Sequence, residues 1–161
     1  MKTFQNIVLS LVYFVIVSFI GYIFVSSYYI YSAFPFTVYM FWLLYVSLGF
    51  TFNCPARVKD GIFSVIAPLF INLALFLYGW KLSNSVPNLQ NPESFDYWAP
   101  FYETNAVIVA SPVFLKKSML YVRYFAVILL PSVLMYVGML LGCTAKRRLK
   151  ESVNNINIGK K

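Results

Sequence analysis

The strongest constraint on this chain is a set of four long apolar runs that carry almost no charge. They cover residues 7–31, 36–53, 61–80 and 120–143, and the sole charged residue within them is Arg123. The hydrocarbon layer of a bilayer is about 30 Å thick, and about 20 helical residues cross it. The sequence therefore predicts an all-α, polytopic integral membrane protein. We expect a four-transmembrane-helix bundle with one long structured outer loop over 81–119.

Composition favours a membrane protein over a soluble one. Apolar residues make up 60% of the 161-residue chain and charged residues only 11%, whereas soluble domains have about 45–50% and about 25%. So few charges cannot cover this much apolar surface in water. We predict one transmembrane domain over 1–145 and a basic cytoplasmic tail over 146–161. The first run exceeds the apolar part of a signal peptide, about 7–15 residues, so we expect it to remain uncleaved.

Basic residues are distributed unevenly between the two ends of the predicted spans. Nine of the thirteen lysines and arginines lie on the side that holds both termini, and loops rich in positive charge stay in the cytoplasm. We therefore expect both termini in the cytoplasm, and the membrane to be a bacterial inner (cytoplasmic) membrane. The nine residues are Lys2, Arg57, Lys59, Lys146, Arg147, Arg148, Lys150, Lys160 and Lys161.

The residue types that carry most enzyme chemistry are scarce. The chain has no histidine and only two cysteines, Cys54 and Cys143, which are far apart in the sequence. Both lie at predicted cytoplasmic ends of helices, where we expect reduced thiols and no disulfide. We predict no catalytic residue, no metal site and no cofactor, and a chain that is not an enzyme. An enzyme would have to rely on the outer-loop carboxylates Glu93, Asp96 and Glu103.

Aromatic residues are concentrated in the middle of the outer loop. Phe95, Trp98 and Tyr102 have the spacing that places side chains on one face of a short helix. They are typical of an aromatic belt at the membrane–water boundary or of a surface that binds a partner protein. The candidate partner-binding residues are Phe95, Asp96, Tyr97, Trp98, Phe101, Tyr102 and Glu103.

A shorter apolar stretch, 106–115, follows in the same loop. Its ten residues are too few to cross a membrane as a helix, which takes about 20. Two placements remain open, a re-entrant segment and a segment that packs on the outer ends of the bundle. We favour the second, because Lys116 and Lys117 follow directly and prefer the headgroup region.

A few residues inside the spans are candidates for helix packing. Asn72 is a polar side chain near the middle of the third run, and an interhelical hydrogen bond is its simplest use. Gly138 and Gly142 form a G-x-x-x-G motif, which lets two helix backbones approach closely. Pro68 and Pro131 predict kinks in the third and fourth helices.

Basic side chains near the ends of spans are typical of contacts with lipid headgroups. For Arg123 an alternative is an ion pair with Glu103 or Asp96. We predict anionic headgroups as partners on the cytoplasmic side, and no nucleic acid, because no basic folded domain follows the spans. The candidate headgroup residues are Lys116, Lys117, Arg123, Lys146, Arg147, Arg148 and Lys150.

These patterns predict a non-enzymatic small membrane protein that works by helix–helix and outer-loop contacts. It would be an accessory subunit of a membrane complex, or an immunity-type protector against a membrane-active toxin. The likeness to immunity proteins is one of four-span architecture, without a shared motif. Its partner would be another membrane protein or a second copy of itself. The alternative is a channel or transporter subunit that passes a small solute or ion through a homo-oligomer.

Overall fold

The computed structural model describes residues 2–26, 34–83, 92–105 and 120–158, and every regular element in them is an α-helix. The all-α expectation is confirmed for this part of the chain. The helices are α1 (Lys2–Ser26), α2 (Phe34–Gly49), α3 (Val58–Ser64), α4 (Ile66–Ser83), α5 (Pro92–Thr104) and α8 (Leu120–Ile158).

Three of these helices contain stretches long and apolar enough to cross a membrane. The stretches are Lys2–Phe24 in α1, Ile66–Ser83 in α4 and Tyr124–Val153 in α8. The predicted second span corresponds to α2, whose 16 residues measure only about 24 Å along the axis. Length and composition thus support three spans, and the prediction of a four-span bundle is confirmed only in part.

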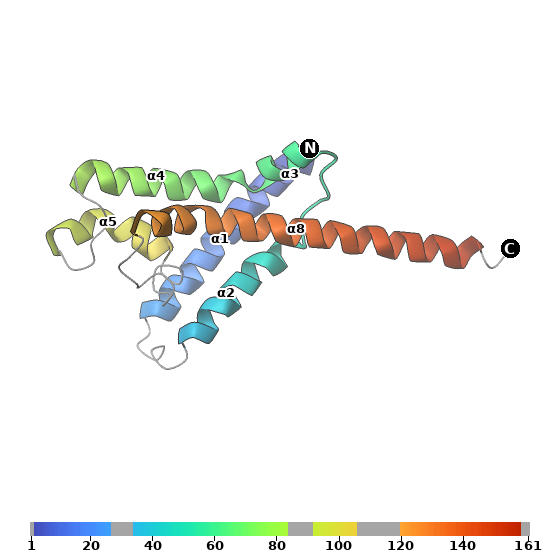
Figure 1. The fold of residues 1–161 in the computed structure, drawn as a ribbon, viewed down its shortest axis with the longest axis horizontal. Helices are drawn as coiled ribbons and strands as arrows, with labels where there is room; N and C mark the ends of the chain where they lie inside the picture. Colours follow the sequence, from blue (N-terminus) through green and yellow to red (C-terminus); the bar gives the residue numbers. More distant parts are fainter. Residues whose placement is uncertain (1, 27–33, 84–91, 106–119, 159–161) are drawn as a thin grey trace.

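Figure 1 shows how the helices are arranged in space. α1 and α2 run side by side and diverge from α4, α5 and the first part of α8. α8 passes along the whole assembly, packs on both α2 and α4, and projects beyond the other helices toward the C-terminus. The single long helix therefore links the two halves of the bundle.

The third apolar run forms two helices instead of one. α3 ends at Ser64, and Val65 leaves the helical conformation with φ −117° and ψ 15° before α4 begins at Ile66. Pro68 explains the break, because a proline has no N–H to donate to the carbonyl four residues earlier, which here belongs to Ser64. The predicted kink at Pro68 is a full interruption, whereas Pro131 lies inside the continuous α8.

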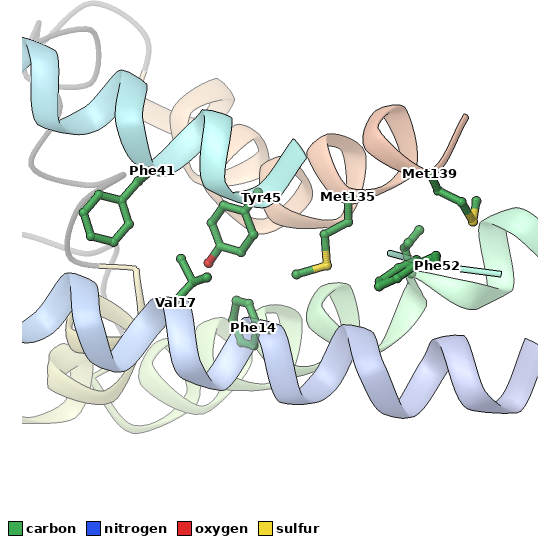
Figure 2. Close-up of a cluster of buried hydrophobic side chains, with 8 residues drawn as sticks. Phe14, Val17, Phe41, Tyr45, Phe52, Met135 and Met139 are labelled. Atoms are coloured by element: carbon green, nitrogen blue, oxygen red, sulfur yellow. The ribbon is translucent and has the colours of Figure 1, made fainter. Parts of the chain in front are cut away.

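Two clusters of buried apolar side chains hold the bundle together. The first fills the space between α1, α2 and α8, and the second joins α5 to α8 and α4. Figure 2 shows the first cluster, with Phe14 and Val17 of α1 facing Tyr45 of α2 and Met135 of α8. Other large apolar side chains point outward, among them Phe70, which is 59% exposed. Such an outer surface is typical of helices that face lipid.

Candidate functional site

The aromatic residues of the outer loop lie on α5, and most of them face inward. Trp98 and Phe101 are fully buried and Tyr102 is 7% exposed, packed with Val127 and Ile128 of α8. The prediction of an exposed partner surface is therefore wrong for these three aromatic residues. The physical reason is that α5 docks lengthwise on α4 and also contacts α1, while its aromatic side chains reach α8, so its apolar face is used within the chain.

The other predicted partner-binding residues are arranged differently. Asp96, Tyr97 and Glu103 are exposed on the opposite face of α5. The side chain of Phe95 lies outside the described residues. Among the side chains that the structure describes, one tyrosine and two carboxylates of the predicted partner surface remain exposed on α5.

Trp98 is held at the end of α4 by a close fit and a hydrogen bond. Its indole Nε1 donates to the Ser83 hydroxyl oxygen at 3.0 Å. Its ring also lies against Gly79, where a Cβ would approach the ring to 2.6 Å. Gly79 was not singled out from the sequence, because a glycine within an apolar run gives no sign of the side chain that covers it.

Asn72 is hydrogen-bonded to Asn105, the residue that follows the end of α5. The Asn105 Nδ2 donates to the Asn72 Oδ1 at 2.9 Å and also to the Phe101 carbonyl at 3.1 Å. Asn72 is fully buried and Asn105 is 2% exposed. No pattern in the sequence pairs these two residues, which are 33 positions apart.

The G-x-x-x-G glycines lie at the crossing of α8 with α2. A Cβ on Gly138 would overlap the Val46 carbonyl oxygen, and one on Gly142 would lie 2.9 Å from the Phe50 Cα. Gly49 of α2 faces Gly138 in the same way, with its own Cβ position 2.9 Å from the Gly138 Cα. The close approach is therefore made within the chain, and Gly49 is a third member that sequence reasoning missed.

A polar cluster closes the end of the bundle where α1 begins. Asn6 is 1% exposed, and its Nδ2 donates to the Asn53 carbonyl at 2.8 Å and to the Ser64 hydroxyl at 3.2 Å. Its Oδ1 accepts the Asn53 backbone N–H at 2.9 Å. These bonds fix the turn after α2 against the start of α1 and the end of α3. In the same region the Lys146 Nζ donates to the Phe52 carbonyl at 3.1 Å.

The two cysteines differ from the prediction that both are reduced thiols. Cys54 and Cys143 form a disulfide with their Cα atoms 5.4 Å apart, a separation that suits such a bond. The expectation of two reduced thiols is wrong in this structure, because α8 passes directly beside the turn after α2. No spacing in the sequence shows that residues 89 positions apart would meet.

The predicted headgroup residues of the tail lie on a helix. α8 continues through them to Ile158, and Arg147, Arg148 and Lys150 are exposed. The Arg147 Nε lies 3.3 Å from a Glu151 carboxylate oxygen, a pair on consecutive turns that contributes only about 0.3–0.5 kcal/mol when exposed.

Several predictions concern residues whose placement is not described. Lys116, Lys117 and the whole of 106–115 lie outside the described residues, and so does the side chain of Arg123. Among the described residues, no group of three or more Cys, Asp or Glu side chains is placed to hold a metal ion.

Comparison with known proteins gives no relative to extend these observations. No protein family, curated protein or solved structure matches the chain.

Proposed function

We propose that this chain is a non-enzymatic integral membrane protein that acts by contact with another membrane protein. It would be an accessory subunit of a complex or an immunity-type protector. One observation carries the proposal. α8 passes without a break from an apolar, span-length stretch into an exposed basic segment that projects beyond the bundle (Figure 1). Such a helix presents charge to a partner while it remains fixed in the membrane.

The length of the projection favours a protein partner. Fifteen residues follow Cys143 in α8, and they extend about 22 Å along the helix axis. The headgroup region adds only about 5–8 Å on each side of the hydrocarbon layer. Lys146 and Arg147 stay near the headgroups, while Lys150, the last basic residue of α8, lies about 10 Å beyond Cys143 along the axis and so just past them. An acidic surface of a membrane complex is the matching partner.

We further propose that α2 is a fourth crossing. Its C-terminal turn returns to the start of α1, because Asn53 is bonded to Asn6. The chain then enters α3 and α4 from that same end. A short span is accommodated by tilt of its neighbours or by local thinning of the bilayer, at a modest cost. With four crossings both termini share one side.

For orientation we rely on charge and place that side in the cytoplasm of a bacterial cell. The disulfide at the same end is typical of an oxidising compartment. Charge takes precedence because it acts when the helices insert. With this orientation Cys54 and Cys143 face a reducing compartment, so their bond forms only under oxidation. A C-terminal tag that reacts with impermeant reagent only after cell lysis supports this orientation. A tag that reacts on intact cells contradicts it.

Purification in mild detergent tests the contact function. We expect the wild-type chain to co-purify with a defined membrane protein. The triple variant R147E/R148E/K150E should no longer co-purify with that protein. The matched control reverses two exposed basic residues at the same end, Arg57 just before α3 and Lys59 in its first turn. Recovery of a lone chain from both wild type and control would contradict the proposal.

The alternative is a channel or transporter subunit, and the buried pair Asn72 and Asn105 is the observation that favours it. Polar groups in a membrane interior are costly and often mark the path of a solute. Solute flux into liposomes that contain only this chain, lost in Asn72→Leu, would support that function over contact.

A further inference from the structure

α5 runs antiparallel to α4 in a continuous register. The Trp98 indole is bonded to Ser83 at the last residue of α4. The Phe101 ring lies 5.7 Å from that of Phe76, and Asn105 is bonded to Asn72. Each step along α5 toward its C-terminus is thus a step along α4 toward its N-terminus.

This register places the end of α5 at the level of the interior of α4. Asn72 lies six residues after the start of α4 and eleven before its end, about 9 Å and about 16 Å along the axis. α4 has the length and apolar character of a membrane span. If α4 crosses the membrane as proposed above, α5 is a re-entrant helix that stops about halfway across.

The amide pair at this level has hydrogen-bonding groups that no described residue uses. Among the described residues, the Asn72 Nδ2 and the Asn105 Oδ1 are buried without a protein partner. One is a donor and the other an acceptor, and they belong to amides that are already bonded to each other. Buried polar groups without a protein partner normally bind an additional molecule, because a buried donor or acceptor that is left unpaired lowers stability.

A second observation also indicates a polar environment. Glu103 is exposed one turn or less from Asn105, and the register places it near the same level. A carboxylate that faces lipid at this depth is costly, so intramembrane carboxylates usually face protein or water-filled cavities. The end of α5 therefore has, among the described residues, two unpaired amide groups on its inward face and a carboxylate that requires a polar neighbour on its opposite face.

We propose that Asn72 and Asn105 bind a small neutral molecule that accepts one hydrogen bond and donates another. Water fits this description, and so does a solute with a hydroxyl or primary amide group. The Asn72 N–H donates to the molecule, and the Asn105 carbonyl oxygen accepts from it. A bare cation does not fit, because the Asn72 amide presents hydrogen atoms. This inference rests on the membrane placement of α4 and is independent of the contact function.

Solid-state NMR on the labelled full-length protein in phosphatidylcholine bilayers tests the site. Magnetisation is transferred from water protons to side-chain nitrogens, and acetamide, urea and glycerol are then added as probe solutes. The reference is the Trp98 indole, a buried N–H whose hydrogen bond is satisfied within the chain. We expect faster transfer to the Asn72 amide than to this indole, and loss of that difference in Asn105→Leu.

The occupant is read from the same spectra. Water transfer without a solute-induced shift identifies water, and a saturable shift of Asn72 and Asn105 with one probe identifies a solute of that class. Transfer no faster than to Trp98, together with no shift by any probe, overturns the proposal. Lipid-to-protein transfer at the exposed Phe70 of α4 is measured in parallel, so a failure of membrane placement is distinguished from a failure of the site.

Discussion

At the scale of single residues, the packing of the bundle depends on a few glycines and on buried asparagines whose amide groups are hydrogen-bonded. Gly138, Gly49 and Gly142 allow the backbones of α8 and α2 to touch. Asn6 uses both ends of its amide to join three segments of the chain. The glycines contribute by permitting close backbone contact, and Asn6 contributes through its hydrogen bonds. These residues bury little apolar area themselves.

Gly138→Ala should destabilise the bundle by about 1–3 kcal/mol, the usual cost of extra atoms in a packed interior. The new methyl group would overlap the Val46 carbonyl oxygen, which belongs to the backbone and cannot turn aside. Unfolding in mixed micelles with increasing SDS measures the change. The control is Leu140→Ala on the exposed face of the same turn, and an equal loss in both variants would contradict the close approach.

The bond between Asn72 and Asn105 predicts a coupling that a double-mutant cycle can measure. Each single change to leucine should cost about 1–3 kcal/mol, because it leaves the other buried amide without its partner. The double change to leucine should cost less than the sum of the singles, because no amide is then left unpaired. Strict additivity in the cycle would show that the two residues act independently.

At the scale of elements, α5 is the part of the chain whose role changes most when the fold is known. It has the aromatic composition of a surface segment, yet Trp98 and Phe101 form the centre of a core cluster. The polar face that remains outward carries Asp96 and Glu103. α5 therefore supports α4 and α8 and presents carboxylates on its other side.

Shortening Trp98 should show how much of the bundle's stability depends on α5. Trp98→Phe removes the hydrogen bond to Ser83 and should cost about 0.5–1.5 kcal/mol. Trp98→Ala also leaves a cavity and should cost about 3–5 kcal/mol. Tyr97→Ala on the exposed face should change stability by less than about 0.5 kcal/mol. If the Trp98 and Tyr97 variants have the same SDS unfolding midpoint, α5 is not docked as described.

At the scale of the whole molecule, α8 and the disulfide connect parts that the sequence separates. α8 contributes to both core clusters. The Cys54–Cys143 bond fixes the turn after α2 to the side of α8. The polar cluster around Asn6 lies at the same end, so that end is fastened by a covalent bond as well as by hydrogen bonds.

Opening the disulfide should lower the free energy of unfolding by up to about 4–5 kcal/mol in the chain-entropy description of a loop this long. The bond closes a loop of 89 positions, so the unfolded chain gains considerable freedom without it. Cys54→Ser, Cys143→Ser and chemical reduction of the wild type should have equal effects. Unequal effects, or identical mobility of reduced and oxidised protein on a non-reducing gel together with two freely alkylated thiols, would contradict the bond.

Much of the helical content could be predicted from the sequence. An uncharged apolar run in a membrane must satisfy its backbone hydrogen bonds internally, and a helix does so locally. The runs at 7–31, 36–53 and 120–143 therefore correspond to α1, α2 and the first part of α8. Pro68 predicted a kink, because the missing N–H is also a local property, but the full interruption between α3 and α4 was not predicted. The spacing of Trp98 and Tyr102 predicted that they share one face of a helix, but it did not predict that this face turns inward.

The partners of these faces were decided only by the tertiary structure. Asn72 meets Asn105, Gly138 meets Gly49, and Cys54 meets Cys143, although each pair is far apart in the sequence. The apolar pattern of a helix specifies that a face will be buried, but it does not specify which helix covers it or at what height. That choice depends on how α8 crosses α2 and how α5 lies along α4, and on the fit of side chains that meet only when the bundle closes.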